Sequence, residues 1–173
     1  MLRPLAAAVC LLLLPASASG QARQWPIEEM AADLAYGFCP LFLAGQFALT
    51  APELAERGFG PQVTKQPHPR VGEMSLVSAR REDGEIAFGG TPGKACTVVV
   101  SGPKREAVLA KLRGSMAYMG LDFHPAANPG PAIAGLKVDT FKAPVDSQML
   151  YVQLVETERP MATVAAQLFA MDN

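Results

Sequence analysis

The sequence predicts a single-domain α+β protein, in which one mainly antiparallel β-sheet is packed by an N-terminal helical region and one middle helix. Three observations lead to this prediction. Apolar residues recur at helical spacing after Ile27 and again after Pro103, and they alternate in several runs after Gly72. The predicted strands cluster around the middle helix and do not alternate regularly with helices. The length of 173 residues suits one domain, which we assign to residues 23–173.

The N-terminal helical region is predicted to begin at Ile27. Its apolar stripe follows a three-then-four rhythm, at Ile27, Met30, Ala31, Leu34, Phe38, Leu41, Phe42 and Gly45. Pro40 has no N–H for the carbonyl four residues earlier, so we expect a kink or restart over residues 37–40. A second short helix is predicted from Pro52, which is tolerated in a first turn, to Gly58.

Residues 60–72 hold three prolines and are predicted to be a surface connection. Beyond them the period of the apolar residues changes to two. Residues 74–81 and 85–88 flank Asp83-Gly84, a typical hairpin signal. Residues 95–100 contain three consecutive valines, which favour a central strand covered on both faces.

The middle helix is predicted to start at Pro103 and to end at Gly120. We expect a short strand over 121–124, and alternation predicts strands over 136–141 and 148–156. Ala162–Met171 fits a strand and fits a helix almost as well, and we interpret it as a strand.

The first 22 residues have the features of a secretory signal peptide. Arg3 precedes a ten-residue apolar run, Leu5–Leu14, and small residues follow Pro15. Cleavage after Ala18 or after Ala22 would satisfy the small-residue rule. Ten helical residues rise about 15 Å, half of a bilayer core of about 30 Å, so this run is too short to be a membrane anchor.

Export predicts a soluble protein of the periplasm or the extracellular space. After residue 22 no apolar run reaches the eighteen or so residues of a membrane-spanning helix, so we expect no membrane span after signal cleavage. Loss of Arg3 with the leader leaves 14 Lys and Arg against 16 Asp and Glu, a formal charge of −2. This balance argues against nucleic acid as a partner, and a composition that is 50% hydrophobic argues against disorder.

Two cysteines, Cys39 and Cys96, remain after processing. An even pair in an oxidising compartment predicts a disulfide bond. There is no Cys-x-x-Cys redox motif, and the two cysteines and two histidines lack the spacing of a zinc site.

The sequence identifies no catalytic residues and implies no cofactor. Neither histidine, His68 or His124, belongs to a recognisable catalytic motif. A weak candidate for a copper site combines His124 and Asp122 with Met116 and Met119, because thioethers bind Cu(I). Methionines at helical spacing are more often core residues, so we assign no metal.

One possible recognition surface is the second face of the strand over 148–156. Met149, Tyr151 and Val155 on this face are too apolar for full exposure, so either the fold covers them or they contact a ligand or partner. We therefore expect a non-enzymatic exported envelope protein that binds a partner protein or a small apolar ligand. The alternatives are an exported hydrolase that uses a histidine with carboxylates, and a periplasmic copper carrier.

Overall fold

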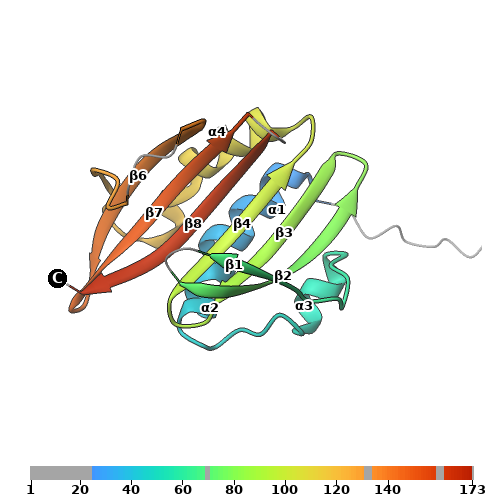
Figure 1. Cartoon of the computed structure of the whole chain (residues 1–173), viewed down its shortest axis with the longest axis horizontal. Helices are drawn as coiled ribbons and strands as arrows, with labels where there is room; N and C mark the ends of the chain where they lie inside the picture. The colour runs from blue at the N-terminus through green and yellow to red at the C-terminus, as the bar shows by residue number, and fades with distance from the viewer. Residues whose placement is uncertain (1–24, 69–70, 131–133, 159–161, 173) are drawn as a thin grey trace, which may run out of the picture.

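An eight-stranded antiparallel sheet forms one layer of the molecule, and helices cover one of its two faces (Figure 1). The structure is a computed structural model that describes residues 25–68, 71–130, 134–158 and 162–172. The predicted fold class, α+β with an antiparallel sheet, an N-terminal helical region and one middle helix, is confirmed.

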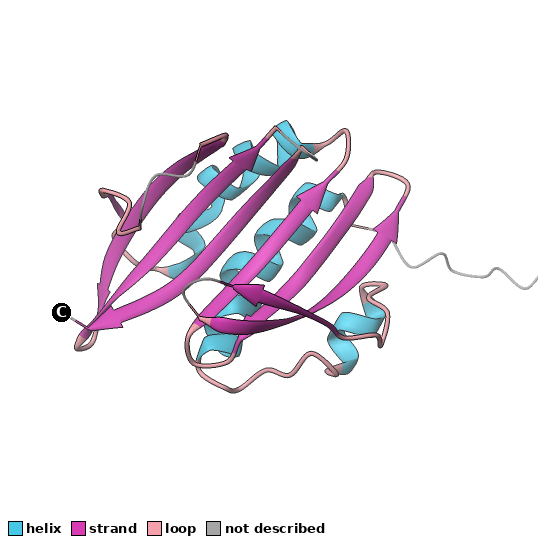
Figure 2. Cartoon of the chain, viewed as in Figure 1, coloured by secondary structure: helices cyan, strands magenta, loops and turns pink. Residues whose placement is uncertain are grey.

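The described residues form six helical segments and eight strands. The helical segments are α1 (Ile27–Asp33), the π-helix η1 (Leu34–Phe38), α2 (Cys39–Leu43), α3 (Pro52–Glu56), α4 (Arg105–Ser115) and the 3₁₀-helix η2 (Met116–Met119). The strands are β1 (Thr64–His68), β2 (Gly72–Arg81), β3 (Gly84–Thr91), β4 (Ala95–Ser101), β5 (His124–Pro125), β6 (Leu136–Val145), β7 (Gln148–Thr157) and β8 (Thr163–Asp172). Figure 2 shows α1, α2 and α4 behind the strands, on the same side of the sheet, and the short helix α3 beside the sheet edge.

The strand order in the sheet is β1-β2-β3-β4-β8-β7-β6-β5. The first four strands run in chain order from one edge to the centre, and the last four run in chain order from the other edge to the centre. Each half of the chain therefore contributes a helical segment followed by four antiparallel strands. The last strand of each half, β4 or β8, lies at the centre of the sheet, and these two pair with each other from Ala95↔Phe169 to Ser101↔Thr163. The three valines of β4 thus occupy a central strand, as the sequence predicts.

The irregular turn expected before Pro40 is the π-helix η1. Here the Cys39 N–H donates to the Leu34 carbonyl, five residues earlier, so the helix accommodates a proline without ending. Tyr36 lies within this segment, and its hydroxyl donates to the Leu112 carbonyl of α4 at 2.7 Å. Burial raises the pKa of this phenol, which therefore stays protonated and remains a donor. The bond joins the two helical segments over the sheet.

The hydrophobic core fills the space between the helices and the sheet. The largest fully buried side chains include Phe42, Phe88, Ile27, Leu34, Leu112 and Leu168. The predicted disulfide crosses this layer: the sulfur atoms of Cys39 and Cys96 are at bonding distance, and the Cα atoms are 5.5 Å apart. The bond closes a separation of 57 residues, which stabilises the fold by on the order of 4 kcal/mol in the chain-entropy model.

Two predictions from the sequence are wrong in detail. Residues 64–68, predicted to lie in a surface connection, form the edge strand β1, which pairs with β2 from Thr64↔Leu76 to His68↔Gly72. The polar side chains of β1 give no alternation of apolar residues, so the sequence did not indicate a strand here. Pro67 is tolerated because an edge strand pairs on one side only. The short strand predicted over 121–124 is displaced to His124–Pro125, whereas Ala162–Met171 is a strand, as we interpreted it.

The signal peptide predicted over residues 1–22, with both of its cleavage sites, lies outside the described residues. Across the part of the chain that is described, no helix has the length and apolar character needed to cross a bilayer.

Candidate functional site: a cavity on the open face of the sheet

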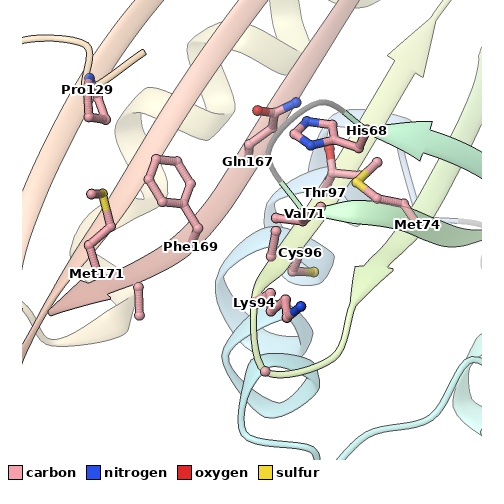
Figure 3. Close-up of a pocket in the computed structure, with 13 residues that line it drawn as sticks. His68, Val71, Met74, Lys94, Cys96, Thr97, Pro129, Gln167, Phe169 and Met171 are labelled. Atoms are coloured by element: carbon pink, nitrogen blue, oxygen red, sulfur yellow. The ribbon is translucent and has the colours of Figure 1, made fainter.

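The sheet face opposite the helices, here called the open face, carries a cavity of about 360 Å³. Its floor comes from residues 93–97, the turn before β4 and the start of that strand, and from residues 167 and 169–171 of β8 (Figure 3). The alternation of a strand explains the placement: Cys96, Val98 and Val100 face the helices, so Ala95, Thr97 and Val99 face the other way.

Two segments rise beside this floor. On one side β1 and the first half of β2 turn across the front of the sheet, so that His68, Val71 and Met74 line the cavity (Figures 1 and 3). On the other side residues 126–130 fold back over the sheet and bring Pro129 to the cavity. This second segment is fixed by the Ala126 N–H, which donates to the Thr140 carbonyl at 2.9 Å.

The bend that forms the first wall depends on Gly89 and Gly90 of β3. Both have a positive φ, 149° and 151°, which residues with a side chain rarely adopt. A Cβ atom on Gly89 would lie 2.1 Å from the Ser75 carbonyl oxygen of β2, and one on Gly90 would lie 2.1 Å from the Ala95 carbonyl oxygen of β4. Only glycine therefore permits this close approach of three strands beside the cavity.

A row of polar side chains crosses the open face, with one residue on each of four neighbouring strands. Pairing places them directly opposite one another in the order Thr97, Gln167, Gln153 and Thr140. Gln153 is 1% exposed, and its Nε2 donates to Asn128 Oδ1 at 2.8 Å and to Thr140 Oγ1 at 3.3 Å. The half of the row outside the cavity is therefore internally hydrogen-bonded.

The half of the row inside the cavity differs. Thr97 is 2% exposed, and its hydroxyl is the one buried side-chain polar group without a hydrogen-bond partner among the described residues. Leaving such a group unpaired costs about 1–3 kcal/mol. Gln167, directly opposite, is half-buried and also lines the cavity, and Figure 3 shows its carboxamide at the same end as Thr97 and His68. Thr97 is therefore a lining residue whose hydroxyl has no protein partner among the described residues.

The rest of the lining is mainly apolar. Phe169 contributes its ring, which stacks on Tyr151 of β7 with the ring centroids 5.3 Å apart and the planes 6° from parallel. Met74 and Met171 add flexible thioether side chains that adapt to the shape of a bound group. Lys94 and His68 are the ionisable groups of the described lining, which contains no Asp or Glu.

The predicted recognition surface lies on this open face. Met149, Tyr151 and Val155 are half-buried, and they alternate with Val152 and Leu154, which belong to the core beneath the helices. The helices therefore do not cover them. Tyr151 stacks on a residue of the cavity wall, and Met149 pairs with Met171 in the strand register, so two of the three residues border the cavity.

The weak metal candidates are divided between the core and the surface. Met116 is buried in the core and Met119 packs against it. His124 and Asp122 form an exposed pair, with Nε2 3.1 Å from Oδ2. Within the described residues, no three His, Cys, Asp or Glu side chains are grouped in a way that could hold a metal ion.

Sequence reasoning missed Thr97 and Gln167. The available signal was that Thr97 is the one polar residue in the apolar run Cys96–Val100, and that Gln167 interrupts the mainly apolar run Ala162–Met171. No family model, no curated protein and no solved structure matches this chain. Its function has to be inferred from the chemistry of the cavity.

Proposed function

We propose that this protein is an exported, soluble, non-enzymatic envelope protein that binds a small, mainly apolar ligand on the open face of its sheet. The observation that carries the proposal is the cavity itself, with a volume of about 360 Å³ over the central strands. Small-molecule sites have volumes of about 300–1,000 Å³ and combine an apolar lining with a few polar groups. The cavity has both properties.

A small ligand is favoured over a partner protein because the surface is concave. Protein interfaces of ordinary size bury about 800 Å² on each partner and are not concentrated in one hollow. The half-buried patch of Met149, Tyr151 and Val155 continues the apolar surface beyond the cavity and would contact the part of a ligand that projects from it.

A binding role is favoured over hydrolysis by the composition of the lining. The described lining around His68 is mainly apolar, with Val71, Met74 and Phe169, and such a lining is typical of a small-molecule binding site. The other histidine, His124, does pair with a carboxylate, but both side chains lie exposed on the surface.

Two features support the exported location. The first is the signal-like leader over residues 1–22. The second is the disulfide between Cys39 and Cys96, both fully buried, because disulfides persist in oxidising compartments and are rare in the cytosol.

Fluorescence titration of the mature protein with N-phenyl-1-naphthylamine tests the binding function. This uncharged aromatic probe brightens when it leaves water, so we expect saturable binding. Ala95→Leu fills the floor of the cavity opposite Phe169 and should weaken binding at least tenfold. Ala87→Leu is the matched control, since Ala87 lies on the same face of β3, opposite Val99 and outside the cavity lining.

Saturable binding that Ala95→Leu weakens and Ala87→Leu leaves unchanged would support the proposal. Absence of saturable binding, or equal effects of the two variants, would contradict it.

A further inference from the structure

The two ends of the cavity differ in chemistry. Thr97 and Gln167 face each other across β4 and β8 at one end, whereas Lys94 lies at the other, three residues earlier on the chain. Lys94 lies in the turn that precedes β4, whereas Thr97 lies within the strand. Between them the wall is apolar, with Phe169, Ala95 and Met74.

The Thr97–Gln167 end suits an uncharged hydrogen-bonding group. A hydroxyl and a carboxamide each donate and accept, so together they can satisfy a ligand hydroxyl or amide in both directions. Burying an unpaired charge is far more costly than burying a dipole, and no described lining residue carries the carboxylate that a cationic ligand would need. Lys94, which would attract an anionic group, lies at the other end of the cavity, away from Thr97 and Gln167. Thr97 lines the cavity and its hydroxyl has no partner among the described residues, so we place the hydrogen-bonding group of the ligand beside Thr97 and Gln167.

The middle of the cavity suits a flat ring. The Phe169 ring is held by its parallel contact with Tyr151, which fixes its orientation. Aromatic rings pack favourably by offset or edge contacts, and methionine sulfur also contacts ring edges favourably. Met74 and Met171 lie on either side of Phe169 in the lining (Figure 3).

We propose that the ligand is an uncharged ring compound that carries a hydroxyl or carboxamide group, and that Thr97 and Gln167 bind this group. The inference rests on the binding function proposed above and specifies its ligand class. Thr97 and Gln167 determine specificity, and Phe169 with the two methionines binds the ring.

A matched pair of competitors tests the inference. Naphthalene and 2-naphthol differ by one hydroxyl, and each displaces N-phenyl-1-naphthylamine from the mature protein if it binds in the cavity. The measured quantity is the ratio of their dissociation constants, naphthalene over 2-naphthol. Thr97→Val keeps the shape of the side chain and removes its hydroxyl, so the ratio should fall roughly 3- to 10-fold, the loss of one hydrogen bond.

Thr140→Val is the control, because Thr140 lies in the same polar row but outside the cavity lining. It should leave the ratio unchanged. Gln167→Met offers the same readout from the opposite strand and keeps the test available if Thr97→Val does not fold.

The outcomes separate the two proposals. If the probe binds, and Ala95→Leu weakens it, but the ratio is the same in wild type, Thr97→Val and Gln167→Met, the ligand class is wrong and the binding function stands. If the probe does not bind at all, both are wrong. A fall of the ratio in Thr97→Val and Gln167→Met, but not in Thr140→Val, supports the inference.

Discussion

Thr97 and Thr140 occupy the two ends of one polar row on the open face, yet among the described residues only Thr140 has a hydrogen-bond partner there, the Gln153 carboxamide at 3.3 Å. Both side chains are buried, at 2% and 5% exposure. The same residue type therefore has opposite energetic roles at the two positions. At Thr140 the hydroxyl completes a network, whereas at Thr97 it has no hydrogen-bond partner among the described residues.

This contrast predicts opposite effects of the same substitution on the unliganded protein. Thr97→Val removes an unpaired buried hydroxyl and should raise the free energy of unfolding by about 1 kcal/mol. Thr140→Val leaves a Gln153 donor without this acceptor and should lower it by about 1 kcal/mol. Urea unfolding measures both, and a loss of stability in Thr97→Val would show that its hydroxyl already has a partner.

The disulfide should contribute a large part of the stability. The Cys39→Ala/Cys96→Ala double variant removes the crosslink that restricts the unfolded chain across a separation of 57 residues. It should therefore lose up to about 4 kcal/mol of unfolding free energy. Reduction of the wild type should have a similar effect and should leave the double variant unchanged. Two reactive thiols in unreduced, native mature protein would contradict the bond.

The bend at Gly89 predicts that this position does not tolerate a side chain. Gly89→Ala places a Cβ against the Ser75 carbonyl oxygen at a strained φ, and should lower the free energy of unfolding by more than about 2 kcal/mol. Gly114→Ala is the control. Gly114 lies in α4 with nothing near its Cβ position, so alanine should stabilise the helix by about 0.5–1 kcal/mol. Thermal unfolding of both variants measures the difference, and equal shifts would contradict the packing at β3.

The start of α1 should be sensitive to acid through Asp83. Its carboxylate accepts from the Ile27 N–H at 3.0 Å and from Arg81 Nε at 2.9 Å. Burial alone raises the pKa of Asp83, but these hydrogen bonds and the Arg81 charge outweigh it, so the pKa lies below its ordinary value.

A lowered pKa in the folded state stabilises the protein above the unfolded pKa of about 4, and this contribution is lost as the pH falls through the folded pKa. Asp83→Asn should therefore cost about 1 kcal/mol at pH 7, and the difference from wild type should shrink below pH 4. Unfolding curves at several pH values measure this, with Glu82→Gln, an exposed neighbour, as the control. A difference that is constant with pH would contradict the role of the carboxylate.

Much of the fold could be predicted because local patterns and the final packing agree. The apolar spacing after Ile27, the hairpin at Asp83-Gly84 and the valines of β4 each reflect burial in the core. Likewise Cys39 and Cys96 could be paired by elimination, since Cys10 is the one other cysteine and lies in the predicted leader.

The cavity could not be predicted, because it depends on contacts between distant segments. The edge strand β1 has polar, exposed side chains and gave no periodic signal, although it forms one wall. The segment 126–130 reaches the cavity through Asn128 and Gln153, which are 25 residues apart. A single threonine in an apolar strand does not indicate which face it occupies, nor that its hydroxyl lacks a partner. Sequence reasoning did find Tyr151 on an unusually apolar face, which borders the cavity.

The most direct test of the proposed binding site is to locate a bound probe on the protein. Backbone amide NMR spectra of the mature protein should be recorded with and without N-phenyl-1-naphthylamine. We predict that the largest chemical-shift changes fall on residues 93–97, 167 and 169–171, the floor of the cavity. Changes concentrated on α1 and α4, on the other face of the sheet, would contradict a ligand site on the open face.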